Sequence, residues 1–388
     1  MIPYARQSID EADIAAVLAV LQSDWLTQGP AVPRFEQSVA NYCGAPFATA
    51  VGNGTMALHL ACLALGVGPG DRVWTSPNTF VASANCARYC GADVDFVDID
   101  ADTLNLSPAK LADNLHAARR EGRLPKVVIP VHFAGRSCDM TTIHGLSHEF
   151  GFHIIEDAAH ALGATHAGER VGGCRFCDVT TMSFHPVKHV TSGEGGMLLT
   201  RDPAIHAQLV RLRTHGITRD PAFMHGESEG PWYYEQVELG FNYRMTDIQA
   251  ALGESQMLRL PEFLRRRKQL VRRYRERLAA LPVGLPAADA DADSAWHLFV
   301  IRVPATLRAA IFAAMRAAGI GVNVHYIPVH FQPDYQRLGF RRGQFPEAER
   351  YYYEAITLPL YPTLSDAEQD RVVDTLAHAL REGGAPCR

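Results

Sequence analysis

The sequence predicts an α/β protein whose core is a mainly parallel β-sheet covered by helices on both faces. Short runs rich in β-branched residues alternate with helical segments, and glycine turns separate them. Such alternation is typical of parallel sheets, because the connections between parallel strands place helices on the faces. A chain of 388 residues with 47% hydrophobic residues can bury a core of that size. The predicted strands are 48–51, 72–75, 94–97, 126–131, 153–155, 179–183 and 197–200.

The chain opens with a predicted helix over residues 9–22, where the acidic pair Asp10 and Glu11 precedes apolar residues at helical spacing. Turn-forming residues over 25–30 then break the pattern. Two further helices should follow the first two strands and end at Leu65 and Tyr89. The apolar positions of the first helix are Ile14, Val17, Leu18 and Leu21.

The pattern changes after Tyr243. A long charged helix is predicted over 260–281, and a low-complexity exposed loop over 287–293 follows it. Strands over 296–303 and 322–327 flank an alanine-rich helix, 305–318, which indicates a smaller α/β domain. We therefore expect a large domain over 1–250 and a small C-terminal domain over 251–388.

The long helix carries two basic clusters, at residues 265–268 and 272–273. A nucleic-acid-binding face is one explanation. However, Leu264, Val271, Tyr274 and Leu278 interleave with the charges, which favours an amphipathic helix whose basic residues face solvent.

Composition favours an enzyme over a nucleic-acid-binding or membrane protein. The net charge is −5 and the pI is about 6.4, so the charge balance calls for neither nucleic acid nor an anionic membrane. No apolar run approaches the roughly 18 residues that span a bilayer, and the N-terminus lacks an apolar signal core. Eight cysteines without regular spacing fit reduced thiols, which predicts a cytoplasmic protein.

The segment around Lys188 predicts a site for pyridoxal 5′-phosphate (PLP). Lys188 follows Ser183 in the run Ser-Phe-His-Pro-Val-Lys, a glycine-rich run over 191–196 comes next, and Asp157 ends an earlier strand. PLP needs an amine that forms a Schiff base with its aldehyde and a carboxylate that holds a proton on its pyridine nitrogen. Lys188 and Asp157 are therefore the candidate catalytic residues. Taken alone, Lys188 could be a surface lysine and Asp157 a helix N-cap.

Residues after two other predicted strands suit the same cofactor. The turn 52–56 leads from a strand into a helix, where glycines and free N–H groups can hold a phosphate. Phe80 could stack on a flat ring. Both features also have a common structural explanation: the glycines of 52–56 could serve only a tight turn, and Phe80 could be a core aromatic residue. Ligands of open α/β sheets bind beyond the carboxyl ends of the strands, so the order of these groups along the chain favours one shared site.

Together these motifs resemble the DegT/DnrJ/EryC1/StrS family of nucleotide-sugar aminotransferases, over nearly the whole chain from Arg6 to Pro362. The resemblance implies a PLP-dependent transferase of the aspartate aminotransferase-like fold (fold type I), with a mainly parallel seven-stranded sheet in the large domain. Segments 23–30, 183–188, 191–196 and 324–330 are most similar to the transaminases of pseudaminic acid biosynthesis. These transfer an amino group from L-glutamate to C4 of a UDP-linked 4-keto-6-deoxy-N-acetylhexosamine, giving a UDP-4-amino-4,6-dideoxy-N-acetyl-altrosamine, with pyridoxamine phosphate as the intermediate cofactor form.

The resemblance also implies roles for individual residues. Lys188 would form the Schiff base and carry the proton between cofactor and substrate, and Asp157 would pair with the pyridine nitrogen. Asn242 would reach the cofactor phosphate of a neighbouring subunit, which implies a homodimer with shared active sites. The other expected cofactor-binding residues are Gly54, Thr55, Met56 and Ser183 at the phosphate, Phe80 on the ring and His160 beside the ring hydroxyl. The resemblance also implies an N-terminal substrate-binding segment over 1–30. The nucleotide-sugar cleft is expected to include Tyr4, Trp25, Leu26, Thr27, Gln28, Arg244, His325, Tyr326 and Ile327.

Other substrates stay open. A UDP-4-keto-pentose, as in 4-amino-4-deoxy-arabinose synthesis, or a 3-keto sugar would suit the same motifs. A PLP-dependent sugar dehydratase is disfavoured, because those relatives carry histidine where this chain has Lys188. A PLP-containing regulator would need an added DNA-binding module.

A metal site is not predicted. Cys174 and Cys177 form a C-x-x-C pair, but no second pair lies at metal-ligand spacing, so buried reduced thiols are favoured. His325 and His330 are more consistent with the lining of a cleft.

Overall fold

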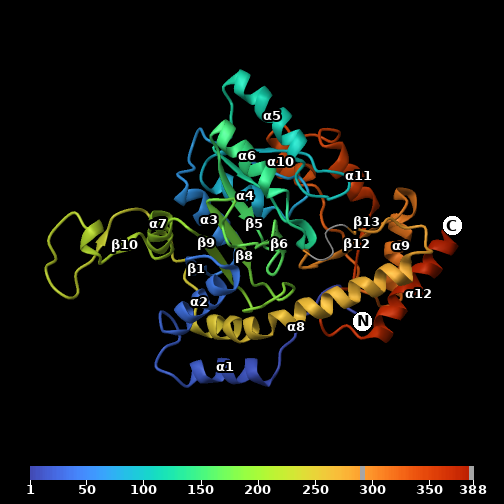
Figure 1. Cartoon of the computed structure of the whole chain (residues 1–388), viewed down its shortest axis with the longest axis horizontal. Helices are drawn as coiled ribbons and strands as arrows, with labels where there is room; N and C mark the ends of the chain where they lie inside the picture. The colour runs from blue at the N-terminus through green and yellow to red at the C-terminus, as the bar shows by residue number, and fades with distance from the viewer. Residues whose placement is uncertain (289–292, 384–388) are drawn as a thin grey trace.

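The computed structural model describes residues 1–288 and 293–383, and a seven-stranded sheet forms its centre (Figure 1). The strand order is β1-β9-β8-β5-β4-β2-β3. Only β9 runs antiparallel, to β1 and β8, while the other neighbouring pairs of this sheet are parallel. The mainly parallel sheet and its seven predicted strands are confirmed. The strands are β1 (Phe47–Val51), β2 (Arg72–Thr75), β3 (Asp93–Phe96), β4 (Val127–Ile129), β5 (His153–Asp157), β8 (Val179–Ser183) and β9 (Gly196–Thr200).

The other described elements are helices and short strands, which cover this sheet or build a second core beside it. The helices are α1 (Glu11–Leu21), α2 (Ala31–Cys43), α3 (Gly54–Ala64), α4 (Ala82–Tyr89), α5 (Pro108–Glu121), α6 (Met140–Phe150), α7 (Pro203–Arg213), α8 (Asp247–Leu278), α9 (Ala305–Ala317), α10 (Pro333–Arg337), α11 (Pro346–Glu354) and α12 (Asp366–Glu382). The short strands are β6 (Thr165–His166), β7 (Glu169–Arg170), β10 (Ile217–Thr218), β11 (Glu235–Gln236), β12 (Phe299–Arg302) and β13 (Ala355–Leu358).

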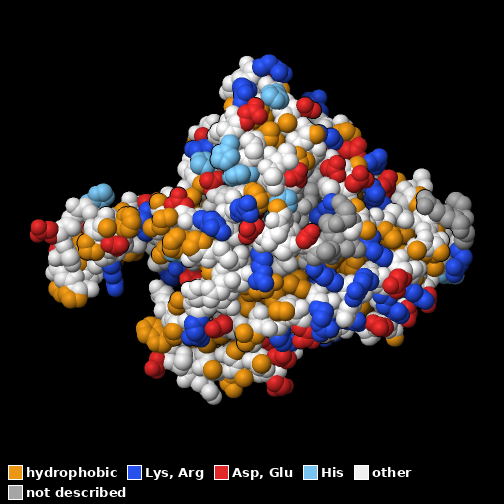
Figure 2. Space-filling view, in the orientation of Figure 1, with side chains coloured by type: hydrophobic (Ala, Val, Ile, Leu, Met, Phe, Trp, Pro, Cys, Tyr) orange, Lys and Arg blue, Asp and Glu red, His pale blue; other side chains and the backbone are white. Residues whose placement is uncertain are grey.

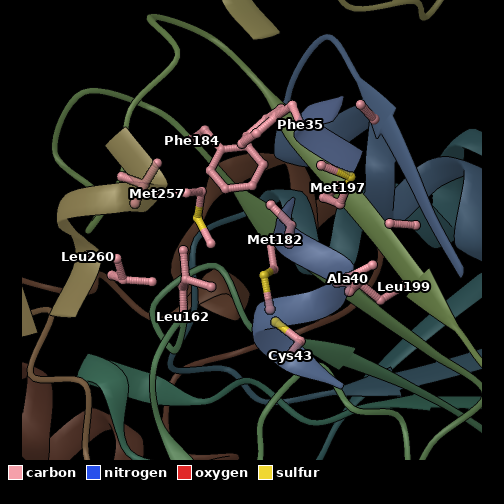
Figure 3. Packing of buried hydrophobic residues seen from close by; sticks show 14 of the residues in the cluster. Phe35, Ala40, Cys43, Leu162, Met182, Phe184, Met197, Leu199, Met257 and Leu260 are labelled. Carbon is pink, nitrogen blue, oxygen red and sulfur yellow. The ribbon is translucent and has the colours of Figure 1, made fainter. Parts of the chain in front are cut away.

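Both faces of the sheet are buried, which explains why its strands read as continuous apolar runs. In β4, Val127 and Ile129 pack with α3 and α4 on one face, whereas Val128 between them packs with α5 and α6 on the other. Around β8 and β9, the second face is covered by α2 and the start of α8. There the rings of Phe35 and Phe184 lie 4.9 Å apart (Figure 3).

The first helix is confirmed as α1, but its apolar positions do not face the core. Ile14, Leu18 and Leu21 are about half exposed, whereas Asp13 is fully buried. The Asp13 carboxylate accepts hydrogen bonds from Ser255 and Gln256 of α8 and pairs with Arg259. These polar contacts, together with the buried Val20, therefore orient this helix on α8.

The long helix α8 joins the sheet to a second apolar core (Figure 1). It begins well before the predicted residue 260, at a capping box in which Thr246 and Gln249 exchange hydrogen bonds. Its later turns bury Leu270, Tyr274 and Leu278 against α9, α12, β12 and β13. Position 250 lies inside this helix, and the division of the chain into two domains at that point stays a prediction. The longest described helices are too polar to cross a bilayer.

One expectation for α8 was wrong. Arg267 belongs to the basic cluster that was expected to face solvent, but it is 1% exposed. Its Nη1 donates to the carbonyl oxygens of Trp296 and His297 at 3.2 Å and of Leu360 at 3.0 Å. Three acceptors offset part of the cost of burying the charge. Burial still lowers the pKa of this guanidinium to about 10.

The prediction of a strand over 322–327 was also wrong. This segment makes one bridge, Asn323 to Thr357, and β12 pairs instead with β13. After the bridge the chain leaves the ladder, because His325 and Tyr326 turn toward a cavity at the edge of the main sheet. The predicted strand 296–303 is shortened to β12, since the N–H groups of Ala295 and His297 bond to Gly135 and Ala134. Part of the predicted exposed loop 287–293 lies outside the described residues.

Arg267→Ala should lower the free energy of unfolding by about 2–4 kcal/mol, because it leaves three buried carbonyls without their donor and opens a cavity. Arg265→Ala, on the exposed side of the same helix, should change it by less than about 0.5 kcal/mol. Chemical denaturation of both variants measures the difference, and equal losses would contradict a stabilising role for the buried arginine.

Candidate active site

A cavity of about 560 Å³ lies beyond the carboxyl ends of the main strands. Asp157 ends β5, Ser183 ends β8, Phe80 follows β2, and Gly54 and Thr55 open α3 after β1. All of them line the cavity. The parallel strands bring residues from distant parts of the chain to one edge, as the sequence predicted.

Lys188 lines the same cavity from the loop between β8 and β9. Burial lowers the pKa of its amine to about 8, against a smaller raising effect of the nearby Asp157 carboxylate. The chain has four lysines, and only Lys188 of these lines the cavity. Lys110 and Lys126 form ion pairs elsewhere, with Asp98 and Asp71. Lys188 is thus the lysine with a substantial neutral, nucleophilic fraction near neutral pH.

Asp157 is held by two donors and is 5% exposed. Its Oδ2 accepts from the Ser83 hydroxyl at 2.6 Å, and its Oδ1 accepts from the Ala159 N–H at 3.1 Å. Ser83 is in turn 2.8 Å from the Thr79 hydroxyl. Asp157 does not cap a helix at this position, since its partner Ser83 lies on the far α4. These two donors therefore fix the orientation of a buried carboxyl group at the edge of the cavity.

The start of α3 forms a turn suited to a phosphate. Asn53 caps the helix, and its side chain accepts the Met56 N–H at 2.9 Å. A Cβ on Gly54 would lie 3.0 Å from Cβ of Ser183, so only glycine lets β8 approach this closely. The first-turn N–H groups of a helix carry a positive dipole end and bind anions well. Met56 itself does not line the cavity, and its N–H is already bonded to Asn53.

Neutral histidines and a tyrosine form the opposite wall. His160 Nδ1 accepts the Ala134 N–H at 3.3 Å, so its Nε2 carries the proton and donates to the Tyr326 hydroxyl at 3.0 Å. Burial holds the pKa of His160 well below its usual value. His325 bonds to the Thr357 hydroxyl at 2.8 Å, and burial lowers its pKa to about 3. Tyr4 reaches this wall from the N-terminus, with its ring 5.4 Å from that of His325.

Eight of the predicted site residues do not line this cavity within residues 1–288 and 293–383. Trp25 and Leu26 are about half exposed on the surface, and Thr27 bridges to Thr246 at the start of α8. Asn242 is exposed beside Thr214. The eight are Trp25, Leu26, Thr27, Gln28, Met56, Asn242, Arg244 and Ile327.

Several residues that line the cavity were not predicted from the sequence. Thr79 and Ser83 follow β2 at the spacing of one helical turn, a signal that could have been read with Phe80. Glu194 belongs to the glycine-rich run that was noted only for its glycines. His297 and Asn323 carried no signal, because their position depends on the packing of distant segments.

The C-x-x-C pair lies away from the cavity. The thiols of Cys174 and Cys177 are each 3.3 Å from the Thr180 hydroxyl. All seven cysteines in the described part of the chain are free, and the same part contains no cluster of three side chains able to hold a metal.

The residues present fit PLP. The cavity offers an amine with a lowered pKa at Lys188, a buried carboxylate at Asp157, a helix N-terminus for the phosphate and an aromatic face at Phe80, which is 58% exposed. A cavity of this volume suits a small cofactor with part of its substrate.

The model of the DegT/DnrJ/EryC1/StrS aminotransferase family matches residues 7–377. The chain is 39% identical over 383 residues to the Bacillus subtilis spore coat polysaccharide biosynthesis protein SpsC, with 97% of this chain and 96% of SpsC covered. It is 34% identical over 389 residues to the UDP-4-amino-4-deoxy-L-arabinose–oxoglutarate aminotransferase of Shewanella sediminis, with 97% of each covered.

Solved structures agree with the family match. Spr1654 of Streptococcus pneumoniae, solved in PMP and PLP forms, is 32% identical; its PMP form has a TM-score of 0.89, with 99% of this chain and 100% of that chain covered. Helicobacter pylori PseC, an aminotransferase involved in pseudaminic acid biosynthesis, is 26% identical with a TM-score of 0.90, and 98% of this chain and 99% of PseC are covered. The chain therefore belongs to the DegT/DnrJ/EryC1/StrS aminotransferase family and is a PLP-dependent sugar aminotransferase.

Proposed function

We propose that this enzyme moves an amino group from L-glutamate to C4 of a UDP-linked 4-keto-6-deoxy-N-acetylhexosamine, with Lys188 and Asp157 as its catalytic residues. The observation that carries the site assignment is a lysine with a lowered pKa sharing one cavity with a buried, doubly bonded carboxylate. When bound, the cofactor supplies a carbonyl that accepts the amino group and a ring that accepts electrons.

The residues that line the cavity have separate roles in this reaction. Lys188 is the amine that bonds to the cofactor and moves the proton at the reacting carbon, because it alone of the four lysines lines the cavity and its pKa of about 8 leaves part of the amine unprotonated near neutral pH. Asp157 holds a proton on the ring nitrogen. Gly54, Thr55 and Ser183 hold the phosphate at the start of α3, and Phe80 covers one face of the ring.

The opposite wall suits a polar, uncharged sugar. His160 and His325 are neutral, so they can donate or accept hydrogen bonds without adding charge. Tyr4 and Tyr326 add a further pair of hydroxyls around the same space. The preference for the 4-keto-6-deoxy-N-acetylhexosamine rests on the sequence resemblance and on the similarity to PseC.

A second candidate substrate is a UDP-4-keto-pentose. The Shewanella sediminis relative is named for 4-amino-4-deoxy-L-arabinose, and its identity to this chain, 34%, exceeds the 26% of PseC. The two substrates differ at C5 and in the N-acetyl group.

A cytoplasmic location remains part of this proposal.

The proposal includes a homodimer whose active sites are shared. The segment between α7 and α8 projects from the body as an arm that carries β10 and β11 and shows hydrophobic side chains on its surface (Figures 1 and 2). Trp232 is 69% exposed and Leu239 80% exposed on this arm. Asn242 and Arg244, at the foot of the arm, do not reach the cavity of their own chain. A second copy that covers the arm would bury these apolar side chains and receive Asn242 at its phosphate site.

Borohydride reduction of the holoenzyme followed by peptide mapping should label Lys188 among the four lysines. Lys188→Ala should lose about 10²- to 10⁴-fold in turnover, since the proton transfer has no other amine. Because the pKa of Lys188 is lowered to about 8, covalent uptake of PLP by the apoprotein should rise with pH and level off above about 8. Reductive labelling of Lys110, Lys126 or Lys268 instead would contradict the assignment of Lys188 as the lysine that bonds to the cofactor.

Mass spectrometry of products from a panel of UDP- and dTDP-linked keto sugars should show the fastest amination at C4 of the UDP-linked 4-keto-6-deoxy-N-acetylhexosamine. One hydroxyl or acetamido group recognised by buried polar groups can discriminate by about 10²-fold or more. Faster turnover of the UDP-4-keto-pentose would favour the second candidate, and amination at C3 would contradict both.

Lys188→Ala and Asn242→Ala chains should restore activity when co-expressed. In a mixed dimer with shared sites, one site carries both defects and the other none, so random assembly should give about a quarter of wild-type activity. Co-expression of Lys188→Ala with Asp157→Ala is the matched control, because both residues serve their own chain and no site is repaired. Recovery no greater than this control would mean that Asn242 does not act across the interface.

A further inference from the structure

The carboxylate of Asp157 is reached by a chain of two hydroxyls from α4 and the turn before it. Thr79 Oγ1 lies 2.8 Å from Ser83 Oγ, and Ser83 Oγ lies 2.6 Å from Asp157 Oδ2. The three side chains are almost fully buried, at 2%, 1% and 5% exposure. Little of their surface reaches solvent, so each hydroxyl depends mainly on the other groups of the chain for its hydrogen-bond partner.

The direction of the chain follows from the number of protons. An ionised carboxylate only accepts hydrogen bonds, so Ser83 must donate its single hydroxyl proton to Asp157. Thr79 must then be the donor in its bond to Ser83. The Ala159 N–H occupies the other carboxylate oxygen at 3.1 Å. Two of these bonds therefore donate a proton directly to the Asp157 carboxylate, and the third donates a proton to Ser83, which is one of the two donors.

Donors of this kind favour the charged form of the carboxyl group over the protonated form. A buried carboxyl group without such donors favours its protonated form, and a proton that it shares with a nearby base then moves to the carboxylate. For a pyridine ring beside Asp157, this means loss of the positive charge on the ring nitrogen. The ammonium form of Lys188, on the cavity side, acts in the same direction as a nearby positive charge.

We propose that Ser83, supported by Thr79, is a positioning residue that keeps Asp157 ionised and thereby keeps the proton on the ring nitrogen of the cofactor. The inference rests on the proposed role of Asp157. If so, α4 contributes to the reaction, because Ser83 in its first turn controls the protonation of the cofactor ring. Phe80, just before this helix, lines the same cavity.

The test loads the apoprotein with PLP labelled with ¹⁵N in the ring and records the nitrogen chemical shift, which differs strongly between protonated and free pyridine. Wild type should show the protonated shift. Ser83→Ala should move the signal toward the free form and lower kcat about tenfold, the effect of one pKa unit, with little change in KM for the sugar. Thr79→Val, which keeps the shape of the side chain but removes the hydroxyl, should cause a smaller shift in the same direction.

Two matched variants separate this role from a general loss of packing. Thr79→Ser keeps the hydroxyl and loses a methyl group, so it should keep the wild-type shift while it lowers the stability of the fold. Cys86→Ala removes a buried side chain one turn further along α4 that bonds to the Ser83 carbonyl and not to Asp157. It should also keep the wild-type shift.

The possible outcomes separate a failure of the role inferred for Ser83 from a failure of the role proposed for Asp157. If Asp157→Ala moves the ring-nitrogen signal while Ser83→Ala and Thr79→Val leave it unchanged, the inference is wrong and the role of Asp157 stands. If Asp157→Ala also leaves the signal unchanged, the proposed role of Asp157 fails and the inference fails with it. Equal changes in Thr79→Ser and Thr79→Val would show that packing, rather than the hydroxyl, is responsible.

Discussion

The buried guanidinium of Arg267 is the contact on which the shape of the active site depends. Its bonds to the carbonyls of Trp296, His297 and Leu360 tie α8 to the segments just before β12 and just after β13. Thr357 of β13 then bonds to both Asn323 and His325. The wall that faces Lys188 is therefore held to α8 through a short series of buried polar contacts. Gly135 completes this arrangement, since a Cβ there would lie 2.6 Å from the Trp296 nitrogen.

The electrostatics of the cavity follow from the same burial. Desolvation lowers the pKa of His160, His297 and His325, so these rings are neutral at physiological pH. It lowers the pKa of Lys188 only to about 8, because the amine has a high intrinsic pKa and the Asp157 carboxylate lies nearby. One environment thus produces two kinds of group: histidines that serve as fixed hydrogen-bond partners, and a lysine that can exchange a proton near neutral pH.

The sheet edge and the C-terminal wall contribute differently. Residues at the sheet edge are placed by strand ends, so Asp157, Ser183 and the start of α3 have positions that the parallel topology determines. Residues of the wall lie on irregular segments whose positions depend on packing against α8 and β13. This division suits an enzyme family in which the cofactor chemistry stays the same and the sugar varies, since the wall can change without moving the strand ends.

The α/β fold, the seven strands of the main sheet and the lysine and aspartate of the cavity could be predicted from the chain alone, because periodic apolar runs and strand-end residues are local signals. The burial of Arg267, the departure of residues 322–327 from the ladder and the place of His297 in the cavity lining depend on long-range packing and could not be predicted. The bond from Ser83 to Asp157 joins residues 74 positions apart, and that of Arg267 to Leu360 joins residues 93 apart. Contacts of this range depend on how the helices pack on the sheet, and no pattern of neighbouring residues encodes them.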